Sequence, residues 1–125
     1  MKAGPSARGQ STVELALVLP VVALLLLLIV QVGMVLRAQV MATHAAREAA
    51  RVVAVTNDAG RAPAAAAAAG GFDPASLRVH VDGSADPGTD VTVSIEHDFS
   101  TDVPLIGPLL GNVNLGASAT MRAEG

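Results

Sequence analysis

The side chains best spaced for metal chemistry lie between Asp82 and Asp90, where four residues with side-chain oxygens stand at even positions. A calcium-binding loop of the EF-hand type needs Gly at its sixth position and Glu at its twelfth, but Pro87 and Val93 stand there. The three histidines show no HExxH or other metal spacing, and there is no cysteine to complete a zinc site. The sequence therefore predicts no bound metal, and it predicts a solvated hairpin turn for this segment.

Catalytic and ligand-binding motifs are also missing from the sequence. No serine lies in a GxSxG elbow or an SxxK arrangement, and there is no GxxxxGK[ST] phosphate loop. Aromatic residues make up only 2% of the chain, with no Trp and no Tyr, so a stacking pocket for a sugar or a base is not expected. Residues 57–125 carry three arginines against nine acids, a net charge of −6, which argues against nucleic acid as a partner. We expect neither an enzyme nor a cofactor or small-molecule substrate.

The residue with the clearest chemical consequence is Glu14. It is the only charged residue among the 24 from Val13 to Leu36, a run long enough to cross a hydrocarbon core of about 30 Å at about 1.5 Å per residue. Thirteen Leu, Ile or Val side chains between Leu15 and Val30 favour insertion by more than one carboxylate at the edge and one glutamine oppose it. The run predicts a membrane span, and a charge kept at this cost suggests a partner.

Three segments together resemble a known family. The first is the apolar helix with Gly9 five residues before Glu14, in RGQSTVELALVLP, which looks like the processing site of type IV prepilins and pseudopilins. The second is AAREAAR at residues 45–51, and the third is LGASATMRAE at residues 115–124. Their order along the chain resembles the TadE-like minor pseudopilins of tight-adherence (Flp-type) pilus systems.

This resemblance implies a structural or assembly subunit of a pilus or related secretion apparatus. Prepilin peptidase would cut between Gly9 and Gln10, and Glu14 would take part in assembly. The implied partners are that peptidase, other pilin or pseudopilin subunits, the inner-membrane assembly platform and membrane lipid. The amino terminus would be cytoplasmic and the carboxyl-terminal head extracytoplasmic, and the resemblance allows incorporation into a surface filament. The basic residues on the two sides of the span leave orientation by charge equivocal.

Two other readings of the chain stay open. It could be a single-pass membrane-anchored protein whose head binds or senses something in the cell envelope. It could also be a secreted protein released by signal peptidase near Val40-Met41-Ala42, although the apolar run is longer than the usual signal-peptide core. The mature amino terminus separates the three: Gln10 for the pseudopilin, Met1 or Lys2 for the anchored protein, and a residue near Thr43 for the secreted one.

Proline and periodicity predict the course of the long helix. Pro20 has no amide hydrogen for the carbonyl of Ala16, so we expect a kink or a melted turn there. Residues 37–56 contain neither Gly nor Pro and should extend the helix beyond the span. One face of this extension is polar: His44, Arg47, Glu48 and Arg51. The opposite face is small and apolar: Ala42, Ala45, Ala46, Ala49 and Val53.

The remaining residues predict a small α+β head that resembles that of a pilin. Residues 62–69 are almost pure alanine and end at Gly70-Gly71, which predicts a short second helix with Pro63 in its first turn. Apolar and polar residues alternate over residues 77–82, 91–96 and 113–123, which predicts a three-stranded antiparallel sheet. The apolar loop at residues 102–112 is expected to pack on the head or to meet another subunit.

The predicted organisation therefore has four parts. Residues 1–9 form a prepilin-type leader, residues 10–36 a transmembrane helix, residues 37–56 an extension of that helix and residues 57–125 the α+β head. Because the head is small and has no cysteine for a disulfide, its stability must come from packing and from neighbouring subunits.

Overall fold

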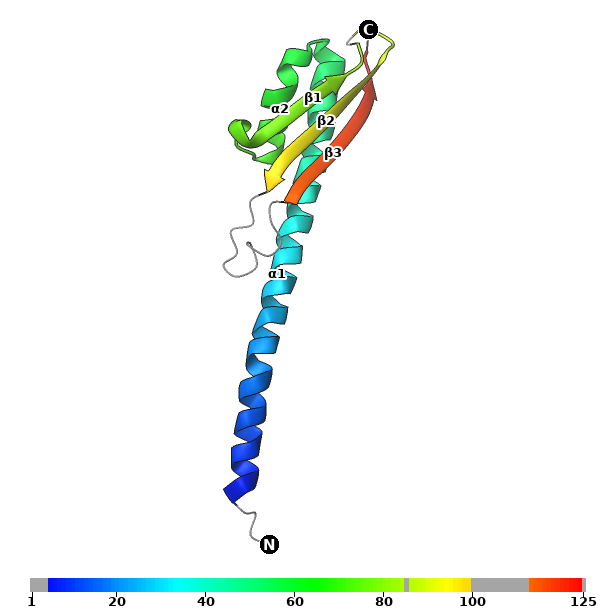
Figure 1. Ribbon diagram of the computed structural model, residues 1–125. Helices are drawn as coiled ribbons and strands as arrows, with labels where there is room; N and C mark the ends of the chain where they lie inside the picture. Colours follow the sequence, from blue (N-terminus) through cyan, green and yellow to red (C-terminus); the bar gives the residue numbers. More distant parts are fainter. Residues whose placement is uncertain (1–4, 85, 100–112, 125) are drawn as a thin grey trace. The chain divides into compact units, whose positions relative to one another are not determined.

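The computed structural model describes residues 5–84, 86–99 and 113–124 (Figure 1). The chain divides into two compact units, Met1–Met34 and Val35–Gly125. The first unit is the amino-terminal part of one long helix. The second contains the rest of that helix and an α+β head, so the predicted fold class is confirmed.

The long helix, α1, runs from Pro5 to Thr56. Apart from Pro20 and Gly33, the segment from Gln10 on contains no residue that disfavours a helix strongly, and proline is tolerated at its first position, Pro5. The helix stops at Asn57, which adopts the left-handed conformation with φ of 52° while its amide still donates to the carbonyl of Val53 at 2.8 Å. The predicted extension of the helix to Thr56 is confirmed.

A short helical connection leads back toward the sheet. Asp58 caps a 3-10 turn, Ala59–Arg61, by accepting a hydrogen bond from the amide of Gly60. Helix α2 follows at Ala62–Gly70, with a proline in its first turn as predicted. It ends at Gly71, whose φ of 64° is the left-handed conformation that glycine adopts at little cost. A second 3-10 turn, Pro74–Ser76, connects α2 to the first strand.

Three antiparallel strands complete the head in the order β1-β2-β3. They are β1 at Leu77–Asp82, β2 at Asp90–Phe99 and β3 at Val113–Arg122. In the register, Val79 stands opposite Ile95 and Ile95 opposite Ala117, so the apolar positions of all three strands share one face. The predicted alternation and the predicted hairpin turn after Asp82 are both confirmed.

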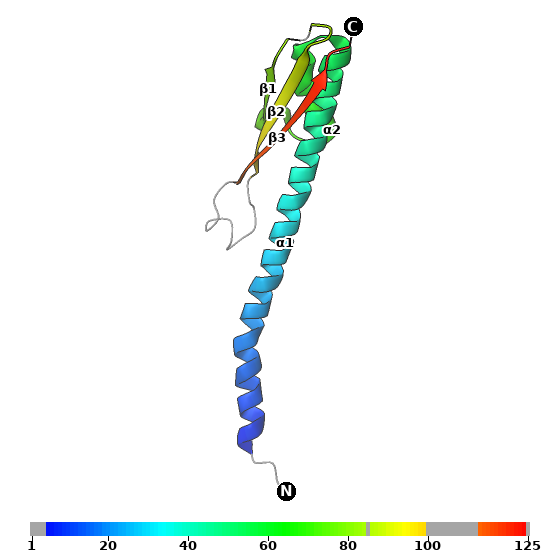
Figure 2. The same ribbon diagram turned by 90° about the vertical axis from the view of Figure 1, so that its right-hand side faces the viewer.

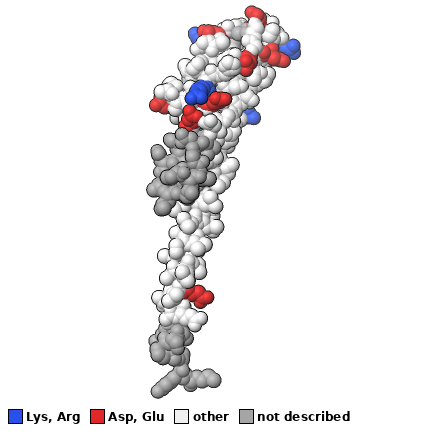
Figure 3. Space-filling view, in the orientation of Figure 1, with Lys and Arg blue, Asp and Glu red and all other residues white. Residues whose placement is uncertain are grey.

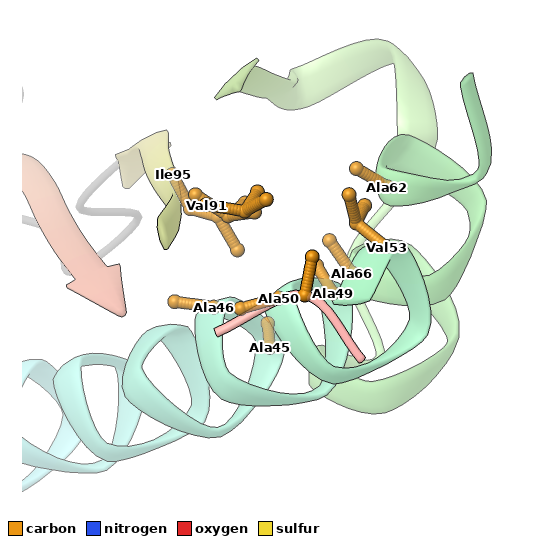
Figure 4. Packing of buried hydrophobic residues seen from close by; sticks show 11 residues of the cluster. Ala45, Ala46, Ala49, Ala50, Val53, Ala62, Ala66, Val91 and Ile95 are labelled. Carbon is orange, nitrogen blue, oxygen red and sulfur yellow. The ribbon is translucent and has the colours of Figure 1, made fainter. Parts of the chain in front are cut away.

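The core of the head lies between this apolar face and the two helices (Figures 1 and 2). Large side chains come from β2, where Val91, Val93 and Ile95 are at most 1% exposed. The helices supply mostly alanines, which allow their backbones to approach the sheet closely. Figure 4 shows Val91 and Ile95 of β2 above a layer of alanines from α1 and α2. The predicted small face of α1 is thus buried, while the predicted packing of loop 102–112 lies outside the described residues.

Candidate functional site: the amino-terminal part of the long helix

The predicted processing residues lie together on one face of α1. Gly9, Val13 and Leu17 follow at intervals of four residues, as do Gln10 and Glu14, and all five line one open hollow on the helix surface. The structure therefore brings together the three residues Gly9, Gln10 and Glu14 that the sequence singled out. Pro20 lies further along the helix and does not line this hollow.

Gly9 is exposed, and a β-carbon placed on it would meet no atom within 4 Å. Packing within the described chain therefore does not require glycine here. Glycine inside a helix costs about 0.5–1 kcal/mol relative to alanine. The packing of the described chain therefore does not offset the cost of glycine at this position.

The helix begins before Gln10, where the sequence predicted its start. It starts at Pro5, five residues before Gln10, so the Gly9–Gln10 peptide bond lies within the helix. The reason is that only a polar and small-residue segment precedes Gly9 after the proline, and nothing in it stops a helix. Cleavage at this bond would require the first turns to open, which the glycine makes easier.

Glu14 is exposed and has no ion pair among the described side chains. No basic residue lies between Gln10 and Leu36. On the face displayed in Figure 3, the described lower part of the helix is white apart from an acidic side chain. Glu14 therefore has no counter-charge among the described side chains.

From Val13 on, the exposed surface of the first unit is mostly apolar. The exposed large side chains there include Val13 at 61%, Leu17 at 70% and Ile29 at 59% of their areas. This helix is long and apolar enough to cross a membrane, judged by length and composition. It is compatible with a single-pass membrane anchor, in which lipid or neighbouring helices would cover these side chains.

Pro20 interrupts the hydrogen bonding of α1 only locally. The helix is continuous through Pro20 and Ala16, so the melted turn is absent from the described helix. Both helical halves are long and the proline removes only one backbone donor, which explains why the helix continues. The kink at Pro20 remains a prediction.

The polar face of the helix extension is partly ordered by an ion pair. Arg51 donates to both carboxylate oxygens of Glu48, at 2.8 and 3.1 Å. These hydrogen bonds lower the pKa of the Glu48 carboxyl and raise the pKa of Arg51. Glu48 and Arg51 therefore pair on the predicted polar face, whereas His44 forms no ion pair with Glu48 within the described chain.

Two contacts between α1 and β3 were not anticipated from the sequence. The side-chain amide of Gln39 donates to the carbonyl of Gly116 at 2.9 Å, and the backbone amide of Glu124 donates to the carbonyl of Ala54 at 3.1 Å. Both join residues about 70 or more positions apart, which no local pattern indicates. They fix the last strand beside the helix extension.

The comparisons with known proteins agree with the sequence resemblance over the helix. Residues 9–51 match the family model described as TadE-like protein, so the predicted resemblance is confirmed for this segment. The match begins at Gly9 and ends at Arg51, and it supports a Tad pilus-associated protein with an amino-terminal apolar helix. This family is one of structural pilus-associated proteins. No curated protein and no solved structure matches the chain.

Proposed function

We propose that this TadE-like chain is a minor pseudopilin, held in the inner membrane by α1 and cleaved by prepilin peptidase between Gly9 and Gln10. The observation that carries the proposal is the position of the family match. It starts at the glycine that the fold does not need and continues through the unpaired Glu14. After cleavage, the chain serves as a structural or priming subunit of a Flp-type pilus or related secretion apparatus.

The arrangement gives Gly9 and Gln10 distinct roles in processing. Gly9 lets the helix open and lets a membrane protease approach the backbone closely. Gln10 becomes the new amino terminus, one helical turn before Glu14 on the same face, at a rise of about 6 Å. Its ammonium group, or that of a neighbouring subunit, can then pair with the Glu14 carboxylate at the edge of the membrane.

The partners follow from this role. They are prepilin peptidase, other pilin or pseudopilin subunits, the inner-membrane assembly platform and lipid around the exposed apolar helix. The amino terminus faces the cytoplasm and the head lies outside it, in the envelope or in the filament. Release by signal peptidase near Thr43 fits less well, because Ala42 is completely buried within α1 and the cut would fall in the helix that covers the sheet.

The mature amino terminus tests the proposal. The chain is isolated from membranes of cells with and without prepilin peptidase, and its terminus is determined by sequencing or intact mass. We expect Gln10 with the peptidase and Met1 or Lys2 without it. Gly9→Leu should leave the full-length precursor, whereas Gly9→Ala should still be cut in part because its side chain is small.

Two results would contradict the proposal. A terminus at Met1 or Lys2 in cells with active peptidase would indicate an ordinary membrane-anchored protein. A terminus near Thr43 would indicate a secreted one. Normal maturation of Gly9→Leu would exclude the role given to the glycine.

A further inference from the structure

A basic face lies along the exposed side of the helix extension in the second unit. We define it as Arg37, His44, Arg47 and Arg51, which follow at spacings of seven, three and four residues and so share one side of α1. All four are exposed. Arg51 is paired with Glu48, but no described carboxylate lies within 4 Å of Arg37 or Arg47.

The floor beside these charges is apolar. Met41 of α1 and Met121 of β3 are half-buried, and they line an open hollow together with His44, Arg47 and the ion pair of Glu48 with Arg51. Since the Glu48 carboxylate is already paired, Arg47 is the cation of this hollow that remains for a protein surface carrying carboxylates.

The same chain carries such a surface at the other end of its head. We call it the acidic tip: Asp58, Asp82, Asp86, Asp90 and Glu124. All five are exposed, and with Arg61 and Arg122 nearby in the sequence the net charge is 2 − 5 = −3. On the face displayed in Figure 3, acidic side chains lie at this end of the head with basic ones beside them, and further acidic side chains lie at its lower end.

Backbone hydrogen bonds hold the acidic tip in one place. The amide of Gly88 in the hairpin donates to the carbonyl of Ala123 at 2.9 Å, and the amide of Ala123 donates to Thr89 at 2.8 Å. The next amide, of Glu124, donates to Ala54 near the end of α1. The hairpin, the end of β3 and the end of α1 therefore form one ordered surface.

We propose that the acidic tip of one copy of this chain docks on the basic face of a second copy. Within one chain the two surfaces are separated along α1, since Ala54 lies seven residues, or about 10 Å, beyond Arg47 and fourteen residues, or about 21 Å, beyond Val40. A neighbour displaced along the helix direction by about 20 Å brings its tip to the face between Val40 and Arg47. The contact joins two different surfaces, so it can repeat from copy to copy in an open, filament-like series. This inference rests on the proposed assembly role and names the surfaces that it uses.

The absence of cysteine from the sequence makes the contact directly testable, because introduced thiols are then the only ones. Two differently tagged full-length copies are produced together in membranes. One carries Val40→Cys, an exposed position on the side of the basic face, and the other carries Ala59→Cys beside the tip. A short bis-maleimide should join the two copies. The matched control replaces Val40→Cys by Ala64→Cys, an exposed position on α2, and should give little product.

Charge reversal and charge exchange then test the electrostatics. Arg47→Glu in the Val40→Cys copy should lower the cross-link yield about fivefold, as expected for the loss of one or two exposed ion pairs at a contact. Adding Asp82→Arg and Glu124→Arg to the Ala59→Cys copy should restore the yield. The control is Arg78→Glu, which makes the same change of charge as Arg47→Glu but on the solvent-facing side of the sheet. It should leave the cross-link yield unchanged.

The inference is overturned if Arg47→Glu leaves the yield unchanged, or if the exchanged charges do not restore it. Restoration by exchange also shows that the variants are folded. Cleavage at Gly9 is measured in the same membranes: uncut chain contradicts the proposed function itself, whereas normal cleavage without a charge-dependent cross-link contradicts only this docking mode.

Discussion

A substitution at Glu14 should separate membrane insertion of the helix from assembly of the filament. A lone carboxylate at the edge of an apolar environment is costly, and so is a lone ammonium, while a pair offsets much of both costs. Glu14→Ala removes the carboxylate without adding polarity, so the helix should still insert and Gly9 should still be cut. Incorporation into filaments, or support of their assembly, should fall about tenfold or more.

The measurement compares processing and piliation in a deletion strain that produces the variant at native level. Glu14→Gln is the matched control for shape: it keeps the size of the side chain and removes the charge, so it should fail like Glu14→Ala. Undiminished piliation by both variants would show that Glu14 only reaches the headgroup layer, and the pairing role would be wrong.

Strand β3 contributes to the stability of the head through the side chains on its core face. Ala117, Ala119 and Met121 pack against the core, and Met121 is half-buried there, directly opposite Val91. Met121→Asp exchanges an apolar side chain on the core face for a carboxylate, and the arginines that line the open hollow offset only part of its cost, so it should destabilise the head by about 2 kcal/mol. This is a large part of the total stability of a small domain, so the head should become sensitive to proteases.

A matched control lies on the opposite face of the same strand. Arg122→Asp is less suitable, because the Arg122 guanidinium donates to the carbonyl of Gly88 at 3.2 Å and Asp90 stands opposite in the register. Ser118→Asp is better, since Ser118 is exposed and faces Ser94. Limited proteolysis of the full-length variants in detergent should show rapid digestion of Met121→Asp and near-normal resistance of Ser118→Asp. Equal resistance would contradict the assignment of the two faces.

The elements could be predicted from the sequence wherever a local pattern determined them. Alternation gave the faces of β1, β2 and β3 because each strand has one buried face, and the small residues of α1 marked the helix side that packs on the sheet. The start of α1 was missed because residues 5–8 contain neither a strong helix signal nor a stop signal. The bond between Gln39 and Gly116 was missed because it depends on tertiary packing between distant residues.

The candidate site could be predicted better than the head's long-range contacts. Gly9, Gln10 and Glu14 are close in sequence, so the helix period alone places them together, as found. The residues of the basic face also follow one another on a single helix, so the helix period places them together. The acidic tip could not be predicted in this way, because only the fold brings Asp58, the hairpin and Glu124 to one end of the head.

At the scale of the whole molecule, the two units have different environments. The first unit exposes apolar side chains from Val13 on, and lipid or other helices would have to cover them. The second has its own core of alanines and the three aliphatic side chains of β2. A fragment beginning at Ala38 keeps every buried residue of that core and the Gln39 contact to β3, so it should be soluble and folded without the span.

Hydrogen exchange on this fragment tests whether its core is the one described. Strand β2 is central in the sheet and its Val91, Val93 and Ile95 are buried, so its amides should exchange most slowly. The amides of β1 should exchange faster, because it is an edge strand whose apolar side chains are only half-buried. Circular dichroism should show helix and strand together. A spectrum of helix alone, with uniformly fast exchange in residues 90–99, would mean that the sheet forms only when α1 is anchored or a second copy is present, and the independent core proposed for the second unit would be wrong.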